Sequence, residues 1–257
     1  MKETIKLISD YDKFKCSPEI VRNIHNIVKK YTGNLDPYKE IKRKNISDAQ
    51  AIYPLLKQFL SKKEDRLYWT LKIAATGNII DYAVYHDVNI EKRVMEELKK
   101  KFAICDIERL KSDLKSAESL LIIGDNAGET VFDRVLIEDL LHLDITYAVR
   151  SEPIINDATI EDARLSGLDC CTRIISTGCN TAGLLLDECS DEFLNIFNSA
   201  DIVISKGQGN YESLSEQKRE IYFLLKAKCP VISMELGVEV NDYVFKWNGH
   251  KENRFYN

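Results

Sequence analysis

The sequence of 257 residues lacks the features that mark several classes of protein. No apolar run reaches the roughly 18–20 residues that are needed to cross a bilayer, so we expect no membrane partner. The first residues, Met1-Lys-Glu-Thr-Ile-Lys6, contain no hydrophobic signal core. These two absences together predict a cytoplasmic protein.

Thiol and imidazole patterns are also missing. The chain has seven cysteines, an odd number, and no two of them have Cys-x-x-Cys spacing. We therefore expect neither a disulfide framework nor a thiolate zinc site, although Cys179 lies inside a motif described below. The four histidines stand apart without ligand spacing. No Gly-x-Gly-x-x-Gly follows an expected strand, which disfavours a dinucleotide-dependent oxidoreductase.

The charge is divided unevenly along the chain. Residues 1–110 carry 22 basic and 16 acidic side chains, whereas residues 111–257 carry 14 and 25. A basic half could attract nucleic acid, but its lysines occur at helical spacings without interleaved aromatic residues. We interpret them as a solvated helical surface and expect no nucleic-acid partner. The acidic half would suit a divalent cation.

The first part of the chain has a helical pattern throughout. Ser17-Pro18 is typical of an N-cap followed by proline at the first helical position. Apolar residues then recur on one face of the expected helix. We predict a helical N-terminal domain over residues 1–111, with helices at 19–31, 48–60, 65–75 and 90–101.

The character of the sequence changes after about residue 112. Short apolar runs, typical of strands, occur at residues 120–123, 145–149, 173–175, 202–204 and 231–234. Helical patterns lie between most of them, including 130–143 and 215–226. Strands buried on both faces and joined by helices indicate a parallel sheet. We predict a doubly wound α/β domain over residues 112–257.

Polar residues and glycines follow every expected strand. In open parallel sheets ligands bind beyond the carboxyl ends of the strands, so these segments should form one site. The five strand ends lead, in order, into Gly124-Asp-Asn-Ala-Gly-Glu129, Arg150 with Asn156-Asp157, Ser176-Thr-Gly-Cys-Asn-Thr181, Lys206-Gly-Gln-Gly-Asn210, and Glu235.

The chemistry of these segments suits a metal ion and a phosphate. Asp125, Asn126 and Asp157 offer hard oxygen ligands, which Mg²⁺ and Mn²⁺ prefer. Lys206 and Arg150 are donors able to hold anionic oxygens. Each piece alone is compatible with ordinary turn, cap or surface chemistry, and their joint placement at strand ends favours a site.

Backbone groups could add to the anion site. Glycines such as Gly178 and Gly207 let N–H groups approach an anion closely, and a helix that begins near Glu129 points its positive end there. Besides the metal ligands and the two cations, we expect the substrate to meet Glu129, Asn156, Thr177, Gly178, Gly207 and Gln208.

With these residues in place, the sequence resembles the metal-dependent damage-control phosphatases, in particular their compact archaeal and bacterial branch. The order and spacing of several motifs carry the resemblance, and they span most of the chain. The motifs are Asp36-Pro-Tyr-Lys-Glu-Ile-Lys42, Thr76-Gly-Asn-Ile-Ile-Asp81, Gly124-Asp-Asn-Ala-Gly-Glu-Thr-Val-Phe-Asp133, Arg150-Ser-Glu-Pro-Ile-Ile-Asn-Asp157 and Ser205-Lys-Gly-Gln-Gly-Asn-Tyr-Glu212.

The resemblance implies a helical N-terminal domain and a Rossmann-like three-layer α/β/α sandwich with a mostly parallel sheet. It also implies one divalent metal, Mg²⁺, Mn²⁺, Co²⁺ or Ni²⁺, held by Asp125, Asn126 and Asp157, with Asn78 and Asp81 facing the site from the helical part. The implied activity is hydrolysis of small phosphomonoesters, such as sugar phosphates or damaged phosphometabolites. This chain departs from its branch at Cys16, which lacks the second cysteine of a Cys-x-x-Cys pair.

Two other function classes stay open. One is an S-adenosylmethionine-dependent carboxyl methyltransferase, and the other is a non-catalytic protein that binds phosphometabolites. Within the phosphatase hypothesis, Asp125 is either a nucleophile or only a metal ligand. Ala127 occupies the position where haloacid-dehalogenase-type phosphatases place an acid/base aspartate, which favours an activated water. The sequence identifies neither the physiological substrate nor the oligomeric state.

Overall fold

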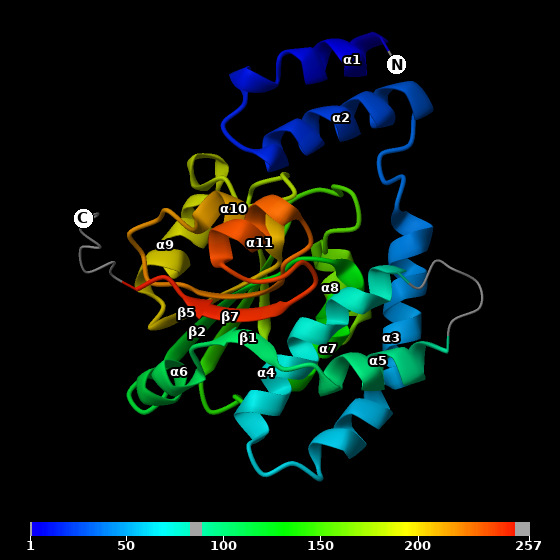
Figure 1. Ribbon diagram of the computed structural model, residues 1–257. Helices are drawn as coiled ribbons and strands as arrows, with labels where there is room; N and C mark the ends of the chain where they lie inside the picture. Colours follow the sequence, from blue (N-terminus) through cyan, green and yellow to red (C-terminus); the bar gives the residue numbers. More distant parts are fainter. Residues whose placement is uncertain (1, 83–88, 250–257) are drawn as a thin grey trace.

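The computed structural model describes residues 2–82 and 89–249, which form three layers with a sheet between two sets of helices (Figure 1). The helices are α1 (Lys2–Ser9), α2 (Ser17–Thr32), α3 (Lys39–Leu60), α4 (Arg66–Thr76), α5 (Ile90–Lys99), α6 (Ile107–Asp113), α7 (Thr130–Ile137), α8 (Ile160–Leu165), α9 (Asp191–Ser199), α10 (Gln208–Leu214) and α11 (Pro230–Leu236). Short 3-10 helices include η2 (Gly77–Tyr82), η3 (Ala127–Glu129) and η5 (Leu186–Glu188). None of the described helices combines the length and apolar character needed to span a bilayer.

The sheet has seven strands in the order β1-β7-β6-β5-β2-β3-β4. The strands are β1 (Phe102–Cys105), β2 (Ser119–Ile123), β3 (Asp144–Val149), β4 (Arg173–Ser176), β5 (Ile202–Lys206), β6 (Tyr222–Lys226) and β7 (Tyr243–Trp247). From β6 to β4 every pairing is parallel, whereas β7 runs antiparallel to β6. This mostly parallel α/β sheet confirms the predicted fold class.

Alternating side chains of the central strands feed two separate cores. On β2, Leu120 and Ile122 join the core beneath α3, α4 and α7, whereas Leu121 and Ile123 join the core beneath α9, α10 and α11. Figure 1 shows the second group of helices, yellow to orange, on the opposite side of the sheet from α4 and α7. Because β2 is covered on both faces, its sequence is a continuous apolar run rather than an alternating one.

Helices of the N-terminal part form one layer of this sandwich. Helices α3 and α4 pack directly against α7, and their buried residues belong to the same core as those of the sheet. The predicted boundary between residues 111 and 112 falls within α6, and β1 already pairs with β7 before it. The helical layer therefore lies over the sheet and delivers its own side chains to the strand ends.

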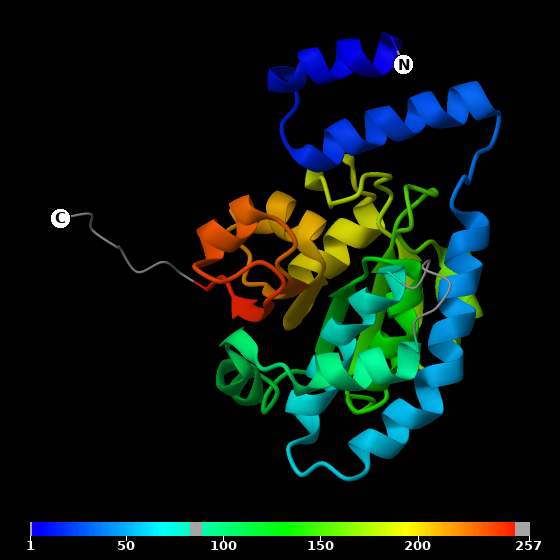
Figure 2. The ribbon, with the colours of Figure 1, turned by 45° about the vertical axis from the view of Figure 1, so that its right-hand side comes forward.

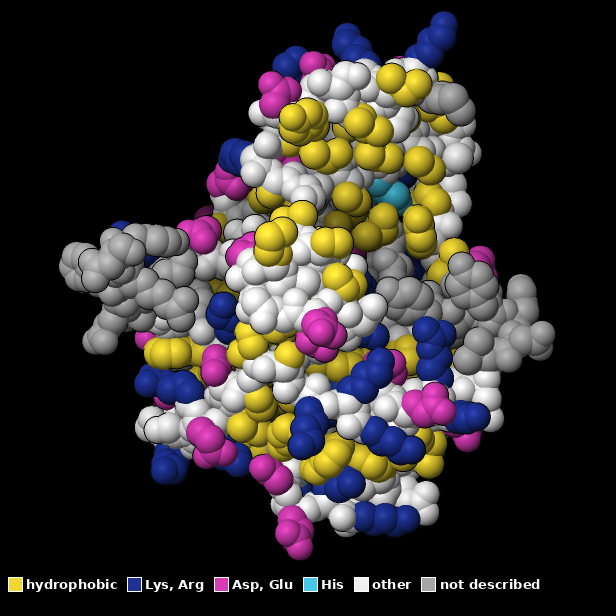
Figure 3. Space-filling view, viewed as in Figure 1, with side chains coloured by type: hydrophobic (Ala, Val, Ile, Leu, Met, Phe, Trp, Pro, Cys, Tyr) yellow, Lys and Arg dark blue, Asp and Glu magenta, His cyan; other side chains and the backbone are white. Residues whose placement is uncertain are grey.

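Helices α1 and α2 form a hairpin outside this layer, at one end of the molecule next to α10 (Figure 2). It is attached by polar contacts: Arg22 pairs with Glu188, and Lys29 Nζ donates to the carbonyl oxygen of Pro153 at 2.6 Å. Figure 3 shows hydrophobic side chains at the hairpin's end of the molecule, with mixed basic and acidic side chains over the opposite half.

Two predictions near the C-terminus were wrong. Residues 215–226 were expected to be helical, but Tyr222–Lys226 is β6, buried at every position. Residues 231–234 were expected to be a strand, but they lie in α11. The helix signals were present in the sequence: Pro230 stands at the first helical position, and Gly237 ends the helix in a left-handed conformation. Glu235 consequently lies on a helix and not at a strand end.

Candidate functional site

The site is built where β2 and β3 end side by side. Asn126, after β2, and Asp157, in the loop after β3, form an isolated antiparallel bridge. Ala127 N–H donates to Asn156 O at 2.9 Å, and Ala158 N–H donates to Asp125 O at 2.8 Å. These backbone bonds bring the three predicted metal ligands together, although Asp157 lies 31 positions after Asn126 in the sequence.

Asp125 is held close to the end of β5. Gly207 follows β5 with φ +82°, and a Cβ at this position would overlap the Asp125 carboxylate. Asn126 Nδ2 donates to Asp125 Oδ2 at 3.2 Å. Only glycine combines the positive φ with this close approach, so Gly207 positions the carboxylate by leaving space for it.

Glu129 lies at the centre of a buried network below these ligands. Its Oε1 accepts from Asn126 Nδ2 at 2.8 Å and from Asn78 Nδ2 at 2.7 Å, and its Oε2 accepts from Lys206 Nζ at 3.0 Å. Lys206 Nζ also donates to Asp133 Oδ1 at 2.6 Å and to Ala74 O at 3.2 Å. An ammonium has three protons, so these partners occupy all of them.

Arg150 is almost fully buried and supports Asp157. Its Nε donates to Asp157 Oδ2 at 2.7 Å, and its Nη2 donates to Asn210 Oδ1 at 2.8 Å. Its third nitrogen, Nη1, is buried without a hydrogen-bond partner among the described residues. The structure therefore joins Arg150 to the predicted metal ligand rather than to open solvent.

The donor atoms fit a hard divalent cation. No hydrogen bond between described residues uses the Oδ1 atoms of Asp125, Asn126 and Asp157, because their other polar atoms carry the contacts. Two carboxylates and one amide oxygen are the ligand types that Mg²⁺ and Mn²⁺ accept. The described residues contain no group of three or more His, Cys, Asp or Glu side chains able to hold a metal, so this candidate depends on the amide of Asn126.

The electrostatics of the site also favour an added positive charge. Burial raises the pKa of Asp125 well above its usual value, and the charges of Glu129 and Asp157 raise it further. Burial likewise raises the pKa of Asp157, against the opposing effect of Arg150. Burial would also raise the pKa of Glu129, but Lys206 holds it below its usual value. Two acidic groups are thus only partly compensated by the protein.

The residues expected from the helical part divide into two cases. Asn78, on η2, reaches the site by its hydrogen bond to Glu129, and its Oδ1 is buried without a partner among the described residues. The prediction for Asp81 concerns a side chain that lies outside the described part of the structure. Helical residues therefore contribute to the site through Asn78.

The remaining predicted substrate residues contact other groups. Asn156 takes part through its carbonyl oxygen, as described above. Thr177 Oγ1 bonds within its own loop, to Cys179, and Gly178 has φ +81° against Ser190. Gln208 points toward the end of β6, where its Oε1 accepts from Lys228 N–H at 2.8 Å. Their contacts leave the predicted binding roles as predictions.

Three residues of the site were missed by the sequence analysis: Asp133, Asn210 and Lys228. The charge of exposed Lys228 lowers the pKa of Asp125, Glu129 and Asp157, which shows that it lies near the carboxylates. It follows β6, and the misplaced strand at 231–234 hid this position. The signal was the apolar run Ile221-Tyr-Phe-Leu-Leu225, which ends just before Lys226-Ala-Lys228.

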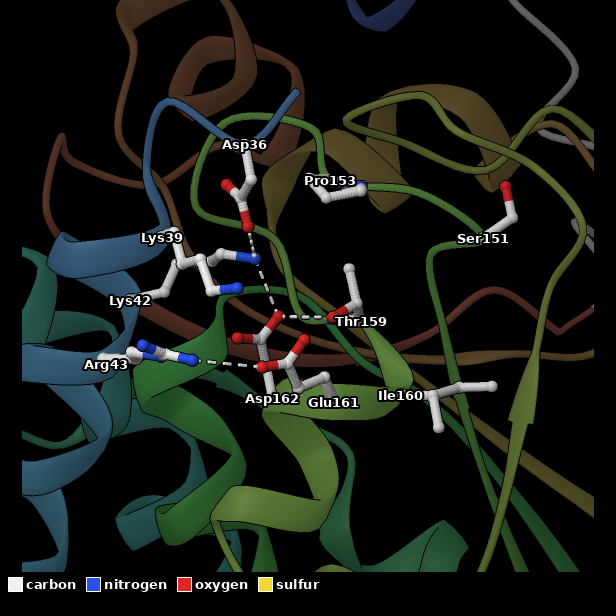
Figure 4. Close-up of a pocket in the computed structure, with 10 residues that line it drawn as sticks. All are labelled: Asp36, Lys39, Lys42, Arg43, Ser151, Pro153, Thr159, Ile160, Glu161 and Asp162. Atoms are coloured by element: carbon white, nitrogen blue, oxygen red, sulfur yellow. Dashed lines mark hydrogen bonds and ion pairs between the residues drawn. The ribbon is translucent and has the colours of Figure 1, made fainter. Parts of the chain in front are cut away.

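A cavity of about 270 Å³ lies between the start of α3 and the segments that precede and follow Asp157 in the chain, and none of the carboxylates described above lines it (Figure 4). One wall comes from the start of α3, with Lys39, Lys42 and Arg43, and the other includes Ser151 and Thr159 from the segment that also carries Asp157. Lys42 Nζ lies between Asp36 and Asp162, at 2.9 and 2.8 Å. The cavity is polar, with charges of both signs.

Comparison with known proteins identifies the family. The model of the damage-control phosphatase ARMT1-like domain matches residues 1–244. The chain is 42% identical over 214 residues to a damage-control phosphatase of Pyrococcus horikoshii, covering 81% of this chain and 74% of that protein. It is 33% identical over 253 residues to a damage-control phosphatase of Archaeoglobus fulgidus, covering 95% and 87%. The chain therefore belongs to the damage-control phosphatase ARMT1-like family.

Other relatives agree with this assignment. An uncharacterized protein of Methanocaldococcus jannaschii is 38% identical over 256 residues, covering 95% of this chain and 84% of its own. The crystal structure of a DUF89 family protein from P. horikoshii superposes with a TM-score of 0.80 at 39% identity, covering 88% of this chain and 80% of that one. The resemblance seen in the sequence is confirmed.

Proposed function

We propose that the protein is a metal-dependent phosphatase that hydrolyses small phosphomonoesters, such as sugar phosphates or damaged phosphometabolites. One observation carries the proposal: Asp125, Asn126 and Asp157 converge at adjacent strand ends, and their Oδ1 atoms are free of hydrogen bonds among the described residues. Relatives named damage-control phosphatases support it.

The three oxygen ligands would hold one divalent cation, Mg²⁺, Mn²⁺, Co²⁺ or Ni²⁺. When bound, such a cation supplies a Lewis acid that stabilises the charge of a phosphoryl group. Asp157 is oriented for this task by Arg150, and Asp125 by Asn126 and the space over Gly207. We expect the protein to contribute mainly a preorganised geometry.

The structure changes the role that we assign to Lys206. Its three protons go to Glu129, Asp133 and Ala74 O, so we propose that it is a positioning residue that holds Glu129 ionised and fixed. The negatively charged phosphate of the substrate would instead meet Lys228 and the backbone N–H groups near Gly207. These groups lie at the ends of β5 and β6, beside the carboxylates.

Water is the nucleophile that we favour. The side chain two positions after Asp125 is Ala127, which is buried and has no group able to donate or accept a proton. A phosphoaspartate on Asp125 would need such a group nearby to activate the leaving oxygen. Isolation of a phosphorylated Asp125 from the reacting protein would contradict this preference.

The polar cavity suits a small hydrophilic substrate better than an apolar one. Its walls carry Lys39 and Arg43 opposite Ser151 and Thr159, groups that can hydrogen-bond hydroxyls and anions. Because the segment with Ser151 continues to Asp157, the cavity is adjacent to the candidate metal site in the chain. A screen of sugar phosphates and damaged cofactor intermediates is the direct way to find the substrate.

The decisive experiment is turnover of p-nitrophenyl phosphate by metal-stripped protein, before and after addition of each of the four cations. We expect no turnover with chelator and recovery with at least one cation. Asp125→Asn and Asp157→Ala should abolish the recovered activity. Asp144→Asn is the matched control and should keep the recovered activity. This exposed residue lies at the amino end of β3, whereas the site lies at the carboxyl end.

The rival hypotheses give different results. A methyltransferase would transfer a methyl group from S-adenosylmethionine and leave phosphomonoesters intact. A non-catalytic binding protein would bind phosphorylated metabolites in the presence of metal without turnover of any of them. Equal turnover with and without chelator would contradict the metal requirement itself.

A further inference from the structure

Glu129 has two kinds of partner, side-chain amides on one oxygen and an ammonium group on the other. Its Oε1 accepts from Asn126 Nδ2 at 2.8 Å and from Asn78 Nδ2 at 2.7 Å. Its Oε2 accepts from Lys206 Nζ at 3.0 Å. All four side chains are buried. Glu129 is not one of the three proposed metal ligands, so a charged carboxylate at this place needs a separate explanation.

Close packing of two short helices brings these side chains together. Glu129 ends η3, and Asn78 lies on η2. A Cβ at Gly128 would lie 2.9 Å from Ile80 Cγ2 and 3.0 Å from Asn45 Cβ. Because glycine has no such atom, η3 can approach η2 closely enough for the hydrogen bond from Asn78 to Glu129.

The amide of Asn126 could face a cation in either of two ways. A side-chain amide has an acceptor oxygen and a donor NH2 group of nearly equal shape, so its surroundings decide which of them points where. Glu129, when ionised, can only accept, so it selects the Nδ2 arm of Asn126. Asp125 Oδ2, at 3.2 Å, selects the same arm. The Oδ1 arm is left for a cation.

We propose that Glu129 is a positioning residue, which orients the amide of Asn126 so that its oxygen and not its NH2 group faces the cation. This role rests on the metal site proposed above. An amide that was turned over would present a partial positive charge to the cation, so a ligand would become a repulsive group of the same volume. Lys206 supports the role because its ammonium favours the ionised form of Glu129, which cannot donate.

Asn78 is the adaptable member of this group. Its Nδ2 donates to Glu129, whereas its Oδ1 is buried without a hydrogen-bond partner among the described residues. If the group at position 129 became a donor, Asn78 could turn over and accept with that oxygen. The polarity of the contact between positions 126 and 129 can therefore be reversed without leaving Asn78 unsatisfied.

Glu129→Gln tests the orientation because it keeps the shape of the side chain and replaces one oxygen by an NH2 group. The ammonium of Lys206 should attract the remaining oxygen, so the NH2 group faces Asn126 and turns its amide over. We expect binding of Mn²⁺ to become about 10–100-fold weaker, the range typical of partners that support metal ligands. The measurement is calorimetric titration of metal-stripped protein with Mn²⁺ in the absence of substrate, with the fold checked by circular dichroism.

A second substitution separates orientation from charge. In Asn126→Asp combined with Glu129→Gln, the carboxylate at position 126 accepts from the amide at position 129, and the total charge equals that of the unaltered protein. Glu129→Gln should therefore weaken Mn²⁺ binding clearly less in the Asn126→Asp background than in the unaltered one. Loss of charge alone, or a general loosening of the fold, would weaken binding equally in both. Asp133→Asn removes a charge from the other carboxylate that holds Lys206, and should cost less Mn²⁺ affinity than Glu129→Gln.

The outcomes distinguish this role from the metal site itself. Failure of the unaltered protein to bind Mn²⁺ would contradict the proposed function and this role together. Equal binding by the unaltered protein and Glu129→Gln, or an equal loss in both backgrounds, would overturn only the role of Glu129.

Nuclear magnetic resonance of the unaltered protein gives a test that does not depend on the folding of Glu129→Gln. The side-chain NH2 protons of Asn126, identified by their absence from the spectrum of Asn126→Asp, should be protected from exchange with water before any metal is added. Exchange as fast as that of an exposed asparagine would overturn the proposal.

Discussion

Arg150 Nε donates to Asp157 Oδ2 at 2.7 Å, and both side chains are almost completely buried. This contact leaves one carboxylate oxygen of Asp157 for a cation and fixes the direction in which that oxygen points. Arg150 Nη2 is in turn held by Asn210 at the start of α10. The orientation of a residue after β3 thus depends on a helix that follows β5.

The first prediction concerns this support. Arg150→Met removes the contact while keeping much of the side-chain volume, so Asp157 loses its fixed orientation. Supporting contacts of metal ligands are typically worth about 10–100-fold in metal affinity or activity, and we expect a loss in that range. The measurement is phosphatase rate as a function of metal concentration, with the fold checked by circular dichroism.

Asp144→Asn again serves as the control, since it alters the same strand at its other end. An unchanged metal dependence in a folded Arg150→Met protein would show that Asp157 does not need this partner, and would weaken its assignment as a ligand.

The second prediction separates close packing from backbone strain. Gly207 and Gly237 both have positive φ, at +82° and +69°, but only Gly207 faces a neighbour, the Asp125 carboxylate. Gly237→Ala should cost about 1–2 kcal/mol of stability, because Gly237 (φ 69°, ψ 36°) lies in the left-handed region, which is unfavourable for a residue with a Cβ. Gly207→Ala should cost at least as much, because Gly207 (φ 82°, ψ 160°) lies in a region essentially restricted to glycine and its Cβ would overlap the Asp125 carboxylate. Only Gly207→Ala should also lose phosphatase activity, since it displaces Asp125.

Denaturant unfolding and phosphatase assays on both variants provide the comparison. Equal activity in the two proteins would mean that the space over Gly207 has no role in placing the carboxylate.

The sequence predicts the parts of this site that depend on a local pattern, and it does not predict the contacts between side chains from distant segments. Asp125-Asn126 could be placed because the buried run of β2 directly precedes it and strand ends converge in a parallel sheet. The role of Lys206 could not, because Glu129 and Asp133 lie on another element and no local pattern shows that they take its protons. Sequence identifies residue types at an edge, while side-chain partners depend on packing.

Strands β1 and β7 were missed for a related reason. β1 alternates between half-buried and exposed positions over only four residues, and its pairing partner β7 lies over a hundred residues away. Such a short segment has no periodicity that differs from a loop. The error after residue 214, where a helix was predicted in place of β6 and a strand in place of α11, had another cause. The apolar run at 231–234 was given more weight than the proline before it and the glycine after it.

The third prediction tests the buried network of Lys206. Lys206→Met leaves Glu129 and Asp133 without their cation in a place that water does not reach. Removal of one partner from a buried ion pair typically costs about 3–5 kcal/mol, and we expect a decrease of that size in the free energy of unfolding. Urea denaturation followed by fluorescence would measure it.

A surface ion pair provides the matched control. Arg66 pairs with Asp139 at the exposed end of α4, and Arg66→Ala should cost about 1 kcal/mol or less. If the two variants were equally stable, the network around Lys206 would have to be far more open to solvent than its burial indicates.

The last prediction concerns a buried lysine that makes no contact with the carboxylates of the site. Lys72, on α4, is fully buried, and its Nζ has no hydrogen-bond partner among the described residues. The nitrogen lies 3.0 Å from the centre of the Tyr243 ring and 5.3 Å from that of Phe102. Burial lowers the pKa of Lys72 to about 7, against a smaller opposite effect of the nearby Glu97.

The direction of the pH effect follows from proton binding. Between about pH 7 and the ordinary lysine value of 10.5, the unfolded chain binds a proton on this side chain that the folded protein does not. The free energy of unfolding should therefore rise with pH in this window, by at most about 1.4 kcal/mol per pH unit from this group. Lys72→Met removes the contribution, so it should be more stable than the unaltered protein at pH 7 and should show a smaller rise up to pH 9.

Denaturant unfolding at several pH values between 7 and 9 gives the two curves, and only their difference is assigned to Lys72, because other titrating groups are common to both proteins. Lys62→Met, at an exposed position after α3, should leave the slope unchanged. A Lys72→Met protein with the same slope as the unaltered protein would mean that the amine keeps its proton when buried, with the aromatic rings and Glu97 supplying enough stabilisation to offset its lost hydration.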